Sequence, residues 1–229
     1  MLRTACSSFL TKVLDRHWQL LEDSDRKEAL FTVVFATLSE GAEEDGSAEE
    51  DAPCQCSEMI LDAIGCKFHE ESVLAASFPS RSLTERVLQE AQKRLASTDW
   101  HDRRTALTAM LVIMEYTSDI FRPLLSSLLP TLRPFLADPV PAVRRKAAFF
   151  FSECGYYCEG AFMEAAPWII GDLQQVVLCS LPDTQMLNGE EFDVLSALYI
   201  LETVAPDIVL SDPTLSLTLI VRLVRSADA

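Results

Sequence analysis

One short run of residues occurs twice in this chain, and the spacing of the two copies constrains the fold more than any other feature. Arg103-Arg104-Thr105-Ala106 recurs further along the chain as Arg144-Arg145-Lys146-Ala147. Each copy follows a turn that carries an aspartate, Asp99 or Asp138, and each precedes an apolar stretch. A period of about 40 residues with two helices per unit is typical of arrays in which stacked helix pairs share one core.

Helical periodicity extends on both sides of this recurrence, with apolar residues three and four positions apart. Glycine is scarce, with 7 residues, which favours helices over sheets. We therefore predict an all-α fold: a HEAT-type α-solenoid of about five antiparallel helix pairs in a right-handed superhelix, related to armadillo arrays. The expected boundaries are a single HEAT-repeat array over 1–229, made of a helix pair at 1–39, an acidic loop at 40–53, a helix pair at 54–97, HEAT repeats at 98–137 and 138–182, and a helix pair at 183–229 that is incomplete at its C-terminal end.

The acidic loop is the strongest candidate for a binding site. Seven of the twelve residues from 40 to 51 are acidic, and the chain as a whole has a net charge of −16. Such a charge repels nucleic-acid phosphates and suits a basic partner, although acidity also serves solubility alone. The loop is either a connector between helices or a contact for basic protein cargo through Glu43, Glu44, Asp45, Glu49, Glu50 and Asp51.

The stretch from Asp99 to Glu153 carries a family resemblance. It contains Arg103-Arg104-x-Ala106, Leu128-Leu129-Pro130 and Asp138-Pro139-x-Pro141-x-Val143-Arg144. This pattern resembles HEAT repeats of the importin-β (karyopherin-β) family, most of all the branch with importin-four and importin-five. The resemblance implies a nuclear transport receptor in cytoplasm and nucleus, which carries basic cargo, binds phenylalanine-glycine repeats of nucleoporins and is controlled by the GTPase Ran.

Members of that family are longer solenoids, and this chain resembles an internal part without the amino-terminal repeats that engage Ran. The last segment, Leu215 to Val224, is strongly apolar. We therefore expect a truncated chain whose exposed apolar ends favour self-association. The alternative function is a HEAT-repeat scaffold subunit of a phosphatase or chromosome-associated complex with no transport role.

The signature residues have structural explanations. Asp138 is expected to cap the next helix, and Pro139 to stop the previous one. Arg144 is expected to meet an aspartate of a neighbouring repeat, and Pro130 to kink an apolar helix. Ala147 is small, as a close helix approach requires. The full signature is Asp99, Arg103, Arg104, Pro130, Asp138, Pro139, Val143, Arg144 and Ala147.

Catalytic and metal-binding patterns are weak. The sequence contains no phosphate-binding glycine loop, G-x-S-x-G or H-E-x-x-H motif, so we expect neither an enzyme nor a cofactor. Cys54-x-Cys56 is too tight for a zinc knuckle with Cys66 and His69. The seven cysteines, an odd number, fit reduced thiols better than a disulfide framework, and Cys154-x3-Cys158 lacks a basic neighbour.

Two further segments have two interpretations each. Trp100, Trp168 and Phe149-Phe150-Phe151 either form pockets for phenylalanine-glycine repeats or pack in the core, and core packing is favoured. Met1 to Leu21 is either a mitochondrial presequence or an amphipathic helix. No run of 18 uncharged apolar residues occurs, so no membrane insertion is expected.

Overall fold

The computed structural model describes residues 24–38, 40–41, 53–74, 80–165, 168–169 and 172, together with Lys12. Over these residues the chain forms α-helices, 3-10 helices and turns without a β-strand, which confirms the all-α class. Apart from Lys12, the segment from Met1 to Leu21 lies outside the described residues, as does the helix pair expected at 183–229. Among the helices of the described part, none is both long and apolar enough to cross a membrane.

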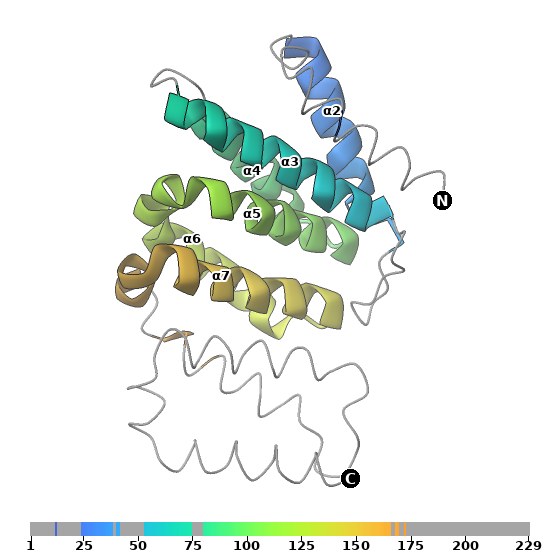
Figure 1. Ribbon diagram of the computed structural model, residues 1–229. Helices are drawn as coiled ribbons and strands as arrows, with labels where there is room; N and C mark the ends of the chain where they lie inside the picture. The colour runs from blue at the N-terminus through green and yellow to red at the C-terminus, as the bar shows by residue number, and fades with distance from the viewer. Residues whose placement is uncertain are drawn as a thin grey trace, which may run out of the picture. The chain divides into compact units, whose positions relative to one another are not determined.

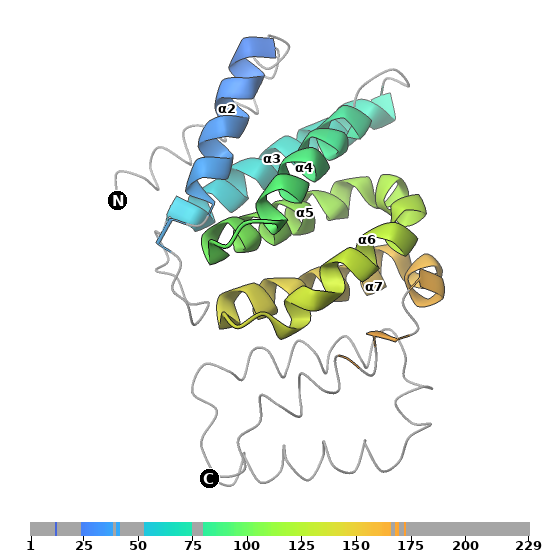
Figure 2. The same ribbon diagram turned by 180° about the vertical axis from the view of Figure 1, so that it is seen from behind.

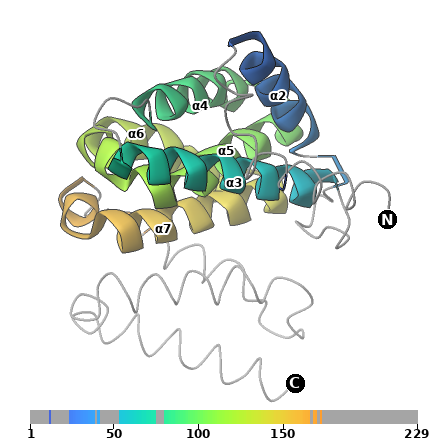
Figure 3. The same cartoon turned by 45° about the horizontal axis from the view of Figure 1, so that its top comes forward.

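The chain divides into two compact units, Met1–Ile120 and Phe121–Ala229. The first contains α2 (Ser24–Thr37), α3 (Pro53–Leu74), α4 (Ser80–Leu95) and α5 (Trp100–Phe121), which ends one residue past the boundary. Helix α3 packs against both α2 and α4, and α3 and α4 run in opposite directions (Figures 1 and 3). Seen from behind, α4 lies in front of α3 and α5 (Figure 2). Helices α3 and α4 occupy the segment for which the sequence predicts a helix pair, 54–97.

The core of the first unit explains why these segments are helical. Its apolar residues recur three and four positions apart, so each helix turns one stripe inward. The largest fully buried side chains contribute about 1.5–3 kcal/mol each when removed from water. They are Leu38, Leu61, Ile64, Leu107, Met110, Ile113 and Met114.

The ring of Tyr116 on α5 packs against Gly65 of α3. A Cβ atom at this position would lie 2.6 Å from Cδ2 of the Tyr116 ring, so only glycine leaves room for that ring. The Tyr116 hydroxyl donates a hydrogen bond of 2.7 Å to Oδ1 of Asp62, one turn before Gly65. Burial, together with the nearby Asp62 carboxylate, raises the pKa of Tyr116 well above its usual range.

Helix α5 is bent near its end. Thr117 has non-helical backbone angles (φ −136°, ψ 27°), and its hydroxyl donates to the Ile113 carbonyl oxygen at 2.8 Å. The helix nevertheless continues to Phe121 and passes directly into a 3-10 turn. The two helices expected in the repeat at 98–137 are thus joined by a bent helical segment.

The second unit contains η2 (Arg122–Leu124), α6 (Leu125–Leu132), η3 (Arg133–Ala137) and α7 (Pro141–Ala165). Helix α7 packs against α6 and η3 (Figure 2). Pro130 lies inside α6, where its missing amide removes one helical hydrogen bond, and α6 gives way to η3 within three residues. Pro141 is the first residue of α7, a position that proline favours.

The turns that precede α5 and α7 repeat the same backbone arrangement at the spacing of the sequence recurrence. The amide of Ser97 donates to the Arg94 carbonyl oxygen at 3.0 Å, and the amide of Asp138 donates to the Phe135 carbonyl oxygen at 3.3 Å. The side-chain oxygen of each turn residue also accepts a hydrogen bond from the amide two residues later, at 3.1 Å for Ser97 and 2.9 Å for Asp138. Asp138 therefore caps the turn just before α7, close to its expected role.

The recurrent arginines, Arg103 and Arg144, also make equivalent hydrogen bonds in the two turns. Arg103 Nη1 donates to the carbonyl oxygens six and five residues earlier at 3.3 and 2.9 Å, and Arg144 Nη1 does the same at 2.8 and 3.1 Å. The amide of each arginine donates to the carbonyl oxygen four residues back, at 3.3 and 3.2 Å. The expectation that Arg144 meets an aspartate of a neighbouring repeat is wrong, because its guanidinium binds the backbone of its own turn.

The buried faces of α5 and α7 follow the same spacing. Many of the positions that correspond under the recurrence are buried in both helices, from the first turns of each helix to the last turns of the alignment. Among them are Ala106 and Ala147, Leu107 and Ala148, Met110 and Phe151, Ile113 and Cys154, and Phe121 and Phe162. The recurrence therefore extends from the Arg-Arg-x-Ala run along the helix that follows. The right-handed solenoid of about five helix pairs stays a prediction.

Candidate functional site

The acidic segment between α2 and α3 is anchored at both ends. The six acidic residues proposed for partner binding, 43–45 and 49–51, lie outside the described residues, but Glu40 and Cys54 do not. The Cys54 amide donates to the Glu40 carbonyl oxygen at 3.0 Å, and the Glu40 amide donates to Thr37 O at 3.2 Å. Gly41 has a positive φ of 76°, a conformation that glycine adopts without steric cost. The hydrogen bond between Glu40 and Cys54 thus holds the two ends of the segment side by side.

Three side chains hold this anchor point, which we call the loop base. The hydroxyl groups of Thr37 on α2 and Ser57 on α3 are hydrogen-bonded to each other. Arg104 reaches the loop base from α5, is only 4% exposed, and donates from Nη1 to the Leu38 carbonyl oxygen at 2.9 Å. Its Nη2 lies 3.6 Å from Oε1 of Glu58. A buried guanidinium needs such acceptors, so Arg104 fixes the loop base to the neighbouring helix.

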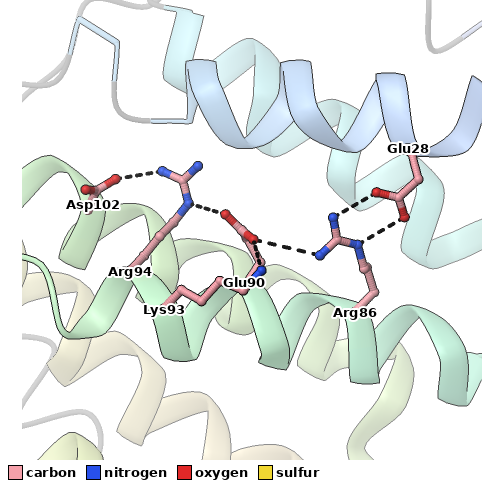
Figure 4. Close-up of polar contacts among 6 residues, drawn as sticks. All are labelled: Glu28, Arg86, Glu90, Lys93, Arg94 and Asp102. Carbon is pink, nitrogen blue, oxygen red and sulfur yellow. Dashed lines mark hydrogen bonds and ion pairs between the residues drawn. The ribbon is translucent and has the colours of Figure 1, made fainter.

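A second charged group lies on the same unit (Figure 4). Arg86 on α4 forms a bidentate ion pair with Glu28 on α2, in which Nε and Nη2 donate to the two carboxylate oxygens at 3.1 and 2.8 Å. Glu90 accepts from Arg94 at 3.0 Å, and Arg94 also donates to Asp102 on α5 at 2.7 Å. This charged network, formed by Glu28, Arg86, Glu90, Lys93, Arg94 and Asp102, links three helices.

The charged network shifts the pKa values of Arg86 and Glu90. The hydrogen bond to Glu28 raises the pKa of Arg86. Burial alone would raise the pKa of Glu90, but the hydrogen bonds and positive charges of Arg94 and Lys93 outweigh burial and lower it below its ordinary 4.5. These carboxylates are paired with cations inside the protein. They are therefore less available to a basic partner than unpaired acidic residues would be.

The aromatic candidates divide between core and surface. Phe150 and Phe151 are fully buried and contact each other edge to face with ring centroids 6.1 Å apart, which confirms core packing for both. Phe149 is half-buried. Trp168 meets Phe151 edge-on at 6.0 Å and lies under the Arg133 guanidinium, 4.6 Å from the ring centroid.

The remaining tryptophan candidate lies at the start of α5. Trp100 is half-buried and stacks on His101 with ring centroids 3.8 Å apart. The His101 Nδ1 atom lies 2.8 Å from Oδ1 of Asp99, which also accepts from the His101 amide at 2.9 Å. These two hydrogen bonds to His101 hold the pKa of Asp99 below its usual value.

The thiols show no arrangement suited to chemistry within the described part of the chain. Cys54 is buried and Cys56 and Cys66 are half-buried, while the side chain of His69 lies outside that part. The expectation that the Cys154-x3-Cys158 pair lacks a basic neighbour is wrong, because the Arg122 side chain is hydrogen-bonded to Cys158. Burial nevertheless raises the pKa of Cys154 strongly and outweighs Arg122 in raising that of Cys158, so both thiols stay protonated and unreactive near neutral pH. Among the described residues, no three His, Cys, Asp or Glu side chains are grouped as metal ligands.

Sequence reasoning missed the charged network and the loop base. The spacing of Arg86, Glu90 and Arg94 at i and i+4 on a helix is a readable signal for part of the network. The acceptor of Arg104, by contrast, is a backbone carbonyl 66 residues away. A main-chain oxygen carries no residue-type signal, so this contact is visible only in three dimensions.

Comparisons with the models of known protein families, with curated proteins and with solved structures give no match to this chain.

Proposed function

We propose that this chain is a HEAT-type repeat segment that binds other proteins, and that it serves nuclear transport in the manner of the importin-β family. The observation that carries the proposal is the pair of turns before α5 and α7. They repeat five kinds of hydrogen bond at the spacing of the sequence recurrence. Local geometry that recurs together with sequence is what a repeat array requires, because each unit must present the same surfaces to its neighbours.

The proposed partner is a basic segment of a cargo protein. The chain has a net charge of −16, and seven of its acidic residues fall between 40 and 51. Carboxylates attract lysine and arginine at long range and raise the rate of encounter. The loop base supports this proposal, since two ends fixed at neighbouring positions lower the conformational entropy that the segment loses on binding.

The wider proposal follows the family resemblance of Asp99 to Glu153. The helices bind phenylalanine-glycine repeats of nucleoporins, Ran releases the cargo, and the protein moves between cytoplasm and nucleus. Binding is the whole activity, with no catalysis and no cofactor.

A binding experiment with purified components tests the proposal. The chain is immobilised and exposed to a fluorescent lysine- and arginine-rich peptide, a phenylalanine-glycine repeat peptide and a phosphatase catalytic subunit. We expect both peptides to be retained, and the basic peptide to be released as salt rises above about 0.15 M because exposed charges are screened. Retention of the phosphatase subunit without either peptide would overturn the transport proposal in favour of a scaffold.

Charge-matched variants separate the acidic segment from net charge. Neutralising three of its residues is expected to weaken binding of the basic peptide about ten-fold at low salt. Neutralising three exposed acidic residues elsewhere removes the same charge and should weaken binding no more than about two-fold. Equal losses would show that the acidic segment is only a connector. The test variant is Glu43→Gln with Glu44→Gln and Asp45→Asn, and the control is Glu115→Gln with Asp119→Asn and Glu164→Gln.

A further inference from the structure

Ser97 and Asp138 hold equivalent places in the two repeated turns. Each amide donates to the carbonyl oxygen three residues earlier, and each side-chain oxygen accepts from the amide two residues later. Each carbonyl oxygen also accepts from the arginine six residues later. One copy of the turn carries a carboxylate where the other carries a hydroxyl. The turn therefore accommodates a negative side chain at this position without a change of backbone.

Basic residues lie on the amino side of Ser97 in the sequence. Lys93 and Arg94 precede it by four and three positions. Of the nineteen lysines and arginines, only Arg81 and Arg94 have a serine or threonine three residues further on, namely Thr84 and Ser97. Thr84 is fully buried, whereas Ser97 is half-buried between exposed Ala96 and exposed Thr98. Ser97 is thus the one hydroxyl of this pattern that solvent reaches in the folded chain.

We propose that Ser97 is a phosphorylation site for a serine kinase that recognises basic residues before its acceptor. The co-reactant is a nucleoside triphosphate with Mg²⁺. A new bond forms between Ser97 Oγ and the γ-phosphorus, the bond from that phosphorus to the β-γ bridging oxygen breaks, and the nucleoside diphosphate leaves. The hydroxyl proton passes to the kinase's catalytic base. The product carries about −1.5 to −2 charges near neutral pH.

The surroundings of Ser97 contain groups of both signs. The Arg103 guanidinium lies 3.3 Å from the Ser97 carbonyl oxygen, and the amino-terminal end of the α5 dipole favours an anion. Asp99 and Asp102 oppose a second negative group, and the matched turn has valines at both corresponding positions, 140 and 143. The attractions and repulsions therefore offset one another. We expect phosphorylation to leave the fold intact and the melting temperature within about 3 °C of its starting value.

The competing contacts of Arg94 are weak enough to yield to a kinase. Arg94 is bound to Glu90 and Asp102, and all three side chains are partly exposed. Exposed ion pairs of this sort contribute about 0.2–1 kcal/mol each. The end of a helix also opens readily, so the last turn of α4 can unwind to present Arg94 and Ser97 together.

The experiment treats the folded full chain with Mg-ATP and the catalytic subunit of a kinase that requires arginine three residues before its acceptor, and maps phosphate by peptide mass spectrometry. We expect close to one phosphate per chain, on Ser97. Ser97→Ala should abolish incorporation, and Arg94→Gln should slow it about ten-fold or more. Thr98→Ala, with helical circular dichroism checked for each variant, should leave the rate unchanged.

Thr84 provides the internal control. It has the same spacing to a preceding arginine, so a chain unfolded in urea, diluted and briefly exposed to the kinase should be modified at both Thr84 and Ser97. The folded chain should be modified at Ser97 alone. Phosphate on Ser97 only after unfolding, or a fall of more than about 10 °C in melting temperature on modification, would overturn the proposal.

Discussion

Arg103 and Arg144 make the same two hydrogen bonds, each to the backbone carbonyl oxygens five and six residues before it. These carbonyls lie in a turn, outside the regular hydrogen bonding of a helix, so the guanidinium supplies the donor that each of them needs. A side chain in the first turn of each helix thus fixes the turn that leads into that helix. A repeat array benefits from this arrangement, because the angle between successive helices must be reproduced in each unit.

Removing the guanidinium of either Arg103 or Arg144 should destabilise the folded chain. Arg103→Met keeps the aliphatic stem but removes both charged hydrogen bonds, and we expect the free energy of unfolding to fall by about 1–2 kcal/mol. Arg144→Met should have an effect of the same size. Urea unfolding followed by circular dichroism measures both. Lys93→Met removes the same charge from an exposed position and should lower the free energy of unfolding by less than about 0.5 kcal/mol. A decrease as large as that of Arg103→Met would contradict a specific role for the arginine hydrogen bonds.

Two helical glycines should respond oppositely to alanine. At Gly65 a Cβ would lie 2.6 Å from Tyr116 Cδ2, so Gly65→Ala should destabilise the chain by about 1–3 kcal/mol through overpacking. At Gly160 nothing lies within 4 Å, so Gly160→Ala should stabilise by about 0.5–1 kcal/mol, the ordinary gain of helix propensity. Thermal melts of the two variants check the sign, and stabilisation by both would show that the Tyr116 ring does not lie against Gly65 as it does in the structure.

The fold was predictable where sequence repeats. The Arg-Arg-x-Ala recurrence and the apolar periodicity predicted a helix at Arg103 and another at Arg144. Helices α5 and α7 are present at these two places. Pro139 predicted the end of the preceding helical segment, and η3 ends at Ala137, two residues before it. Each of these signals is local, because a helix and its cap depend on residues within a few positions of one another.

The contacts that join helices were not predictable in the same way. Arg104 binds the carbonyl oxygen of Leu38, and Arg86 binds Glu28 across 58 residues. The chain offers many other arginines and glutamates for such pairs, and charge alone does not specify a partner. The error over Arg144 has the same origin. Its sequence context indicates a repeated geometry of the turn, but a backbone acceptor is not encoded by any residue type.

Cys154 should be unreactive in the folded chain. Burial, reinforced by the nearby Cys158 and Glu153, raises its pKa, so little thiolate is present near neutral pH. Iodoacetamide at pH 8 should therefore modify Cys154 at least about a hundred times more slowly than the half-buried Cys56, as measured by peptide mass spectrometry. In guanidinium chloride the two rates should converge. Rapid native labelling of Cys154 would instead indicate that the second unit opens readily.

Glu90 should make the stability of the first unit depend on pH. Burial would raise its pKa, but Arg94 and Lys93 lower it below 4.5 in the folded chain. A carboxyl group with a lowered folded pKa stabilises the folded state above its unfolded pKa, and this contribution is lost as the pH falls through the folded value. We expect Arg94→Gln to raise the Glu90 pKa, as followed by NMR titration of its Cδ resonance. The variant should be less stable than the parent chain at pH 7, and the difference should shrink as the pH falls below 4.5 and through the lowered pKa of Glu90.

Lys93→Gln should act on Glu90 in the same direction but more weakly, because the contribution of Lys93 is smaller than that of Arg94. The order of the two variants therefore separates a specific pair from a general loss of positive charge, since each substitution removes one charge. If Arg94→Gln left both the Glu90 titration and the pH dependence of stability unchanged, the Glu90 carboxylate would have to be solvated by water rather than paired with Arg94 on α4.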